Sequence, residues 1–151
     1  YTFVTLPPIA LIFLYFHNYI TLPSDPLTYV LAIVSTMMAA FIQFFITYSL
    51  AMMAFWILEI TTFVFIVYSF EYFLGGQMFP IDIMPAGIQA VMKWMPFYYE
   101  LFCPVAIFLE RLRGPALFQA LAIQTGWLFL TWAAARGMWR RGLSHYQAVG
   151  G

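Results

Sequence analysis

Residues Tyr29 to Leu74 read YVLAIVSTMMAAFIQFFITYSLAMMAFWILEITTFVFIVYSFEYFL and carry only two charged side chains, Glu59 and Glu71. At a rise of about 1.5 Å per residue, these roughly 46 residues would form about 70 Å of helix. The hydrocarbon core of a bilayer is about 30 Å thick, so the stretch is long enough to cross it twice. It therefore predicts two membrane spans joined by a short turn.

The composition of the whole chain agrees with a membrane location. Hydrophobic residues make up 64% of the 151 residues and charged residues 8%, and the mean hydropathy is +0.88. Soluble domains carry roughly 25% charged residues, because their surfaces face water. Aromatic residues reach 21%, which is typical of helices with Phe toward lipid and Tyr and Trp at the interfaces. The net charge is zero, and nothing in the sequence indicates nucleic-acid binding.

The predicted fold class is an all-α membrane protein, a bundle of about four transmembrane helices. Pro7 and Pro8 would kink the first span or mark its start. Gly75-Gly76 ends the third, and Pro115 opens the fourth at a position where helices tolerate proline. No Gly or Pro marks the turn between the second and third spans, so its position follows from length alone. The expected spans cover residues 2–20, 27–50, 54–74 and 115–135.

A different kind of segment, residues 77–113, precedes the last span. It contains four prolines and half of the charged residues, yet it stays rich in Phe, Tyr, Trp and Met. Within it an apolar stripe at helical spacing faces away from Gln89 and Lys93, which predicts an amphipathic helix too short to cross a bilayer. We expect this segment to lie in the interface or to re-enter the membrane. The stripe consists of Ile88, Val91, Met92 and Met95.

Positive charge predicts the orientation. Arg136, Arg140 and Arg141 follow the fourth span with no acidic residue beside them, which places the tail 136–151 in the cytoplasm. Segment 77–113 is then external, and the turn near residues 50–54 is cytoplasmic. The predicted location is a multi-pass protein of a bacterial-type plasma (inner) membrane.

Polar side chains inside the spans are the candidates for a substrate pathway, because burying them in lipid is costly. We expect Glu59, Gln43 and Gln124 to serve this role, with the two glutamines also forming hydrogen bonds between helices. Glu59 lies near the cytoplasmic end of its span, where it also fits an interfacial position. Glu71 lies near the outer end, and an interfacial position is the preferred interpretation there.

No catalytic or cofactor motif is present. The chain has no GxxxxGK[ST], HExxH, CxxC or GxSxG pattern, so no catalytic residue, cofactor or metal is expected. Cys103 is the single cysteine and is expected to be a small buried hydrophobe. His17 and His145 lie at opposite ends of the chain, which argues against a shared metal site.

Several short motifs follow one another in a specific order over the latter two-thirds of the chain. They are Ala54-Phe-Trp56, Leu74-Gly-Gly-Gln-Met-Phe-Pro80, Ile83-Met-Pro85, Met95-Pro-Phe97, Pro104 and Met138-Trp-Arg-Arg-Gly-Leu-Ser-His-Tyr-Gln-Ala-Val-Gly150. In this order and topological placement the chain resembles the permease subunit of ABC-2 type ABC transporters, and within them the ABC-2 family transporter proteins. It departs from the family pattern at His145, where the family tail more often carries Arg.

The resemblance implies a six-span permease that pairs with a second permease and docks a separate ATP-binding cassette ATPase. This chain would supply spans three to six and hydrolyse nothing itself. It begins at Tyr1 in apolar sequence without a charged leader, so we expect upstream sequence to be missing. The main contacts to the ATPase lie in that upstream part of the family, and no coupling residue carries over.

Two other functions remain as alternatives at this point. The first is a membrane-embedded enzyme acting on lipid-linked substrates, which would use the external acids Asp82, Glu100 and Glu110. These acids are spread out rather than clustered. The second is a non-catalytic membrane assembly subunit. The preferred interpretation is an exporter permease that works by alternating access.

Overall fold

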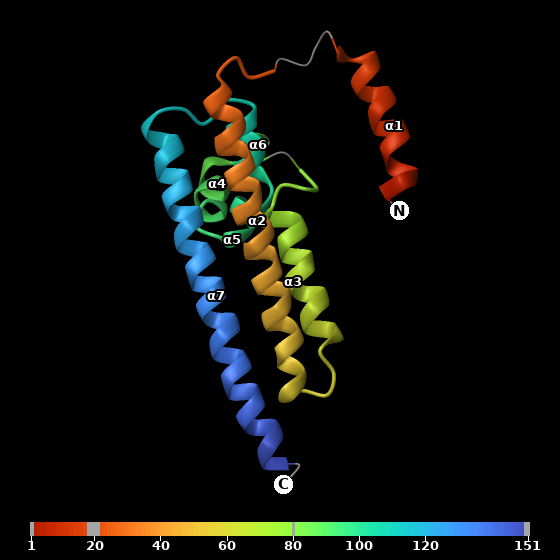
Figure 1. Ribbon diagram of the computed structural model, residues 1–151, viewed down its shortest axis with the longest axis vertical. Coiled ribbons are helices and arrows are strands. Elements are labelled where there is room, and N and C mark those ends of the chain that lie inside the picture. The colour runs from red at the N-terminus through yellow and green to blue at the C-terminus, as the bar shows by residue number, and fades with distance from the viewer. Residues whose placement is uncertain (1, 18–21, 80, 150–151) are drawn as a thin grey trace.

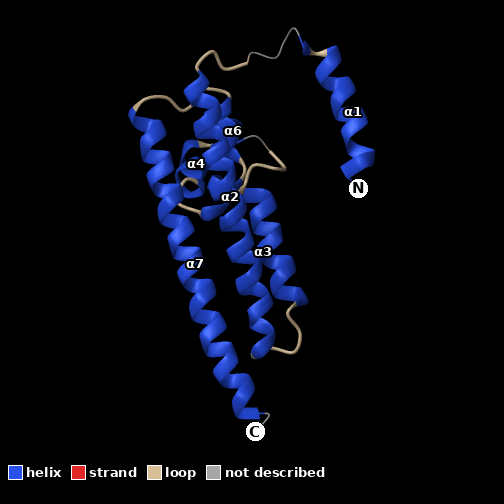
Figure 2. Cartoon of the chain, viewed as in Figure 1, coloured by secondary structure: helices blue, strands red, loops and turns tan. Residues whose placement is uncertain are grey.

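The computed structural model describes residues 2–17, 22–79 and 81–149. Within these ranges the chain forms helices joined by loops, and no strand is present (Figure 2). The helices are α1 (Thr2–Tyr15), α2 (Pro26–Met52), the 3-10 turn η2 (Met53–Phe55), α3 (Thr61–Leu74), the 3-10 turn η3 (Ile81–Ile83), α4 (Ala86–Met92), α5 (Pro96–Glu100), α6 (Phe102–Phe108) and α7 (Pro115–Val149).

Two long helices, α2 and α7, form the frame of the molecule and lie side by side (Figure 1). Asp25 caps α2, because its Oδ1 accepts a hydrogen bond of 3.0 Å from the Leu27 N–H, and Pro26 occupies the first helical position. Pro115 opens α7 in the same way, directly after Gly114. By length and composition, Pro26–Phe55 and Pro115–Ser144 can each cross a membrane.

The other two expected spans are shorter helices. α1 and α3 each have 14 residues, which corresponds to about 21 Å of helix and falls short of a bilayer core. α1 continues through both Pro7 and Pro8, and every described side chain from Phe3 to His17 is exposed. Residues 18–20 of the expected first span lie outside the described ranges. Two of the four expected spans are thus long enough to cross a membrane, and the other two are shorter apolar helices.

The third span starts later than expected. The chain leaves α2 through η2, runs as a loop over residues 56–60, and enters α3 only at Thr61 rather than near Ala54. Hydropathy misses this loop because the loop contains neither Gly nor Pro and remains apolar. The end of α3 matches the sequence signal, because Gly75 is its C-cap and Gly76 adopts a left-handed φ of 82°.

Segment 77–113 folds back against the frame instead of extending away from it. α5 and α6 pack on α2, and α5 also contacts α3 and α7, so the segment lies between the long helices near their N-terminal ends (Figure 1). We call Pro96–Phe108, which consists of α5 and α6 joined at Leu101, the inner hairpin. Its buried side chains are Tyr98, Tyr99, Cys103, Pro104, Ala106 and Ile107. Cys103 is thus buried among apolar neighbours, as its sequence context indicates.

The amphipathic helix predicted in this segment is α4, which is only seven residues long. Met92 is its one buried apolar side chain, whereas Ile88 and Val91 are exposed. Gln89, on the opposite side, turns back to the chain and donates from Nε2 to the Met84 carbonyl at 2.8 Å. Ile88 and Val91 of the apolar stripe therefore face the surroundings of the protein, as side chains in a membrane interface would, while Met92 is turned into the fold.

α7 runs without a break from Pro115 to Val149, so the expected tail continues the last helix instead of leaving it. Phe55 and Trp139 form an edge contact with ring centroids 6.4 Å apart. At Gly142 an added Cβ would lie 2.3 Å from Cδ2 of Phe55, so any larger residue there would force the Phe55 ring to move. This close packing fixes η2, and with it the start of loop 56–60, against the C-terminal half of α7.

Candidate functional site

A buried polar contact joins the inner hairpin to both long helices. We call Gln124, Ser35 and Tyr99 the anchor. The Gln124 side chain is fully buried on α7; its Oε1 accepts from Ser35 Oγ at 2.8 Å, and its Nε2 donates to the carbonyl oxygens of Ser35 and Tyr99, each at 2.9 Å. Both amide hydrogens are therefore used in this arrangement.

The position of the anchor shows how deeply the hairpin is inserted. Ser35 and Gln124 each lie about 14 Å along their helix from its first residue, so α2 and α7 meet at matching heights. The Tyr99 hydroxyl donates to the Lys93 carbonyl at 2.9 Å, and the Cys103 thiol lies within hydrogen-bonding reach of the Ser35 side chain. Gln124 forms the interhelical hydrogen bonds expected of it, and it sits in packed protein rather than along an open cavity.

A second polar group lies further along α2. We call Gln43, Glu71 and Glu100 the acidic cluster, with one member each from α2, α3 and α5. Gln43 Nε2 donates to Glu71 Oε2 at 3.2 Å, and Glu71 is close enough to Glu100 to repel it electrostatically. Gln43 Oε1 and both carboxylate oxygens of Glu100 are buried without a hydrogen-bond partner. Buried acceptors without donors are costly, so the cluster is incomplete in this conformation.

The structure rearranges the predicted pathway residues. Gln43 faces Glu71, which the sequence had favoured as an interfacial residue, and Glu59 is apart from both in the exposed loop 56–60. Glu100 joins them although it was grouped with the external acids. A sequence signal was available, because Glu100 directly follows the apolar run Pro96-Phe-Tyr-Tyr99, which places its carboxyl beside hydrophobic surroundings.

The three acids proposed for an enzyme do not converge. Asp82 forms an ion pair with Arg111, and Glu110 forms one with Arg113. Glu100 belongs to the acidic cluster and makes neither contact. Surface ion pairs of this kind hold loops together and leave the carboxylates occupied. In the part of the chain that the structure describes, no three His, Cys, Asp or Glu side chains could hold a metal ion.

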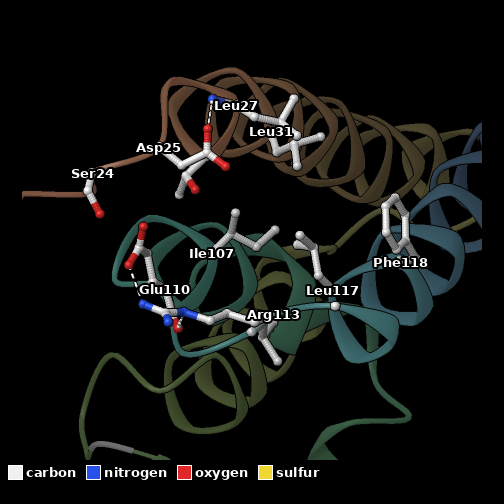
Figure 3. Close-up of a pocket in the computed structure, with 12 residues that line it drawn as sticks. Ser24, Asp25, Leu27, Leu31, Ile107, Glu110, Arg113, Leu117 and Phe118 are labelled. Atoms are coloured by element: carbon white, nitrogen blue, oxygen red, sulfur yellow. Dashed lines mark hydrogen bonds and ion pairs between the residues drawn. The ribbon is translucent and has the colours of Figure 1, made fainter.

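An outer pocket of about 440 Å³ opens between the start of α2, the loop after α6 and the start of α7 (Figure 3). Leu31, Ile107 and Leu117 form apolar walls, while Asp25 lies across from Glu110. Glu110 has a φ of 55°, a left-handed conformation that reverses the chain and turns its carboxylate toward Arg113. Arg113 is paired with Glu110, and Asp25 accepts the Leu27 N–H as the cap of α2. These charged side chains of the pocket therefore already have partners within the protein.

Comparison with known proteins gives one match. The family described as ABC-2 family transporter protein matches residues 2–150, which is nearly the whole chain. No curated protein and no solved structure matches this sequence at a significant level. The family match therefore carries the functional conclusion, and the structure supplies the geometry.

Proposed function

The chain belongs to the ABC-2 family transporter proteins, and on this premise we propose that it is an exporter permease driven by a separate ATP-binding cassette ATPase. Membership in the family and the apolar helices make it an integral membrane protein and a permease-type transporter subunit. Under the proposal it pairs with a second permease, crosses the membrane several times and keeps its C-terminus in the cytoplasm. ATP hydrolysis then takes place in the partner subunit.

The observation that carries this proposal beyond the family match is the position of the inner hairpin. This segment packs against α2 and α7 near their N-terminal ends, where under the proposal it limits passage between the two helices. Toward the opposite end, a cavity of about 260 Å³ lies among Ile46, Val67 and Met138 of α2, α3 and α7. Under the proposal, alternating access would open and close the space between the long helices at these two ends in turn.

The exposed apolar surface supports both lipid contact and pairing. Large side chains such as Phe41, Phe44, Phe118 and Phe129 are all more than half exposed on the two long helices. Monomeric soluble proteins rarely leave such surfaces uncovered, whereas lipid or a second permease would cover them. Within the proposal Gln43 lies on the pathway inside the bundle and Glu59 at the cytoplasmic entrance, whereas Gln124 holds the inner hairpin against the long helices.

The proposal is tested by co-expressing the full-length permease with an ATP-binding cassette subunit of the same organism and purifying through the permease. We expect the two subunits to elute together, and the complex to hydrolyse ATP faster in lipid when a transported compound is added. A partner whose P-loop lysine is replaced by alanine is the matched control and should still bind but not hydrolyse. A permease that associates with no such subunit would contradict the proposal.

A further inference from the structure

A further cavity, of about 370 Å³, lies between the end of α4, the helix α5 and the start of α7. We call it the aromatic cavity. Aromatic side chains and a lysine meet there with a row of α7 residues that includes two alanines. Its lining includes Lys93, Trp94, Tyr98, Ala116, Gln119 and Ala120.

The charge of the aromatic cavity is unbalanced. Lys93 is the one charged residue in its lining, and in the described ranges it has no ion pair, whereas Arg111 and Arg113 of the same segment are each paired with a carboxylate. The Lys93 backbone is held in place, because its carbonyl accepts the Tyr99 hydroxyl. A cation in a partly apolar cavity attracts an anion more strongly than it would in open water.

The walls of the aromatic cavity suit an apolar chain. Ala116, Ala120 and Ile123 recur at helical spacing on one face of α7. The small side chains of Ala116 and Ala120 leave room for the cavity. Trp94 lies at the rim with 78% of its surface exposed, as an aromatic residue at a membrane interface would.

We propose that the aromatic cavity binds an anionic amphiphile, with a carboxylate or phosphate head group at Lys93 and the beginning of its apolar chain along Ala116 and Ala120. This deepens and rests on the proposed function, because such a molecule is either a transported compound or an acidic lipid of the surrounding membrane. The outer pocket is a poorer site for it, because the charge of Arg113 is already neutralised by Glu110.

The test measures binding of radiolabelled dodecyl phosphate to the full chain, with and without its ATPase, in phosphatidylcholine nanodiscs. Empty nanodiscs supply the background. We expect Lys93→Gln to weaken binding at least tenfold, because the variant loses the charge-assisted hydrogen bond to the head group. Lys93→Arg should retain most of the affinity. Arg140→Gln removes a cation from the exposed far end of α7 and should bind as the parent does.

A second variant tests the apolar part without changing charge. Ala116 is exposed, so Ala116→Leu should fold normally, fill the cavity and reduce dodecyl phosphate binding about tenfold, at about 1.4 kcal/mol per factor of ten. Tryptophan fluorescence and elution volume confirm the fold of both variants. Binding that is unchanged in Lys93→Gln or in Ala116→Leu overturns the proposal.

Two further arms identify the source of the anion and separate this proposal from the proposed function. Competition by phosphatidylglycerol in the nanodisc identifies a membrane lipid, whereas Lys93-dependent stimulation of ATP hydrolysis by dodecyl phosphate identifies a transported compound. Binding of dodecyl phosphate is measured without ATP. If the chain binds it through Lys93 but associates with no ATPase, only the proposed function is refuted. Association with an ATPase combined with Lys93-independent binding refutes only this inference.

Discussion

The anchor and the acidic cluster are two buried polar groups that use the same helix, and they differ in how completely they are satisfied. Ser35 and Gln43 are separated by about 12 Å along α2. At the anchor, Gln124 uses its amide oxygen and both amide hydrogens. At the acidic cluster, three buried oxygen atoms of Gln43 and Glu100 lack a donor.

This difference indicates which contacts hold the fold and which can change. Fully satisfied buried networks make a structure rigid, whereas a partly satisfied one favours any rearrangement or ligand that supplies the missing donors. We therefore expect the inner hairpin to stay fixed to α2 and α7 through the anchor. The acidic cluster, where α3 and α5 meet α2, is the place where we expect movement during transport.

The largest effect is expected from breaking the anchor with Gln124→Leu. The change removes three hydrogen bonds and leaves the Tyr99 carbonyl and the Ser35 hydroxyl buried without their partner. We expect the free energy of unfolding to fall by about 3 kcal/mol. Thermal unfolding in detergent measures the loss, and Gln119→Leu, an exposed position on the same helix, should change stability by less than about 0.5 kcal/mol. Equal effects of the two variants would refute the anchor.

A smaller effect of opposite sign is expected at the acidic cluster. Glu100→Gln replaces a buried carboxyl group that has no hydrogen-bond partner by an amide, which supplies a donor beside the buried acceptors. We expect it to raise the free energy of unfolding by about 1–2 kcal/mol. Glu110→Gln is the matched control, because Glu110 is paired with Arg113, and it should leave stability unchanged or slightly lower. A loss of stability in Glu100→Gln would show that the cluster is already complete.

The smallest effect is expected at an exposed ion pair, which sets the scale for the two buried groups. Asp82→Asn breaks the ion pair between Asp82 in η3 and Arg111. The Asp82 side chain is 51% exposed and the Arg111 side chain 55%. We expect a change of about 0.2–1 kcal/mol that shrinks at high salt. Thermal unfolding at low and high ionic strength measures it. A salt-independent loss as large as that of Gln124→Leu would mean that this surface contact, and not the anchor, holds the segment.

The sequence predicted the helical class and two helices long enough to cross a membrane, because each has a strong local signal. Asp25-Pro26, Gly75-Gly76 and Gly114-Pro115 mark helix ends through backbone chemistry that does not depend on the rest of the fold. Loop 56–60 carries no such signal, so Glu59 was expected inside a helix that starts only at Thr61.

The hydrogen-bond partners of the polar residues could not be predicted from the sequence in the same way. The sequence indicates that Gln124 needs hydrogen bonds, but its acceptor is the backbone carbonyl of Tyr99, and a backbone carbonyl has no sequence signature. Likewise, the meeting of Glu71 with Glu100 depends on where α5 inserts relative to α3. These contacts are set by tertiary packing between segments far apart in the chain.

The most direct test of the central claim, that the inner hairpin is inserted against α2, uses the single native cysteine. Ser35→Cys places a second thiol next to Cys103, where disulfide geometry requires Cβ atoms about 3.5–4.5 Å apart. After mild oxidation of membranes, we predict that mass spectrometry finds an intramolecular disulfide joining the substituted position to Cys103, with no disulfide-linked dimer and neither cysteine open to alkylation. Rapid alkylation of Cys103 by a membrane-impermeant maleimide, without an intramolecular disulfide, would contradict the account.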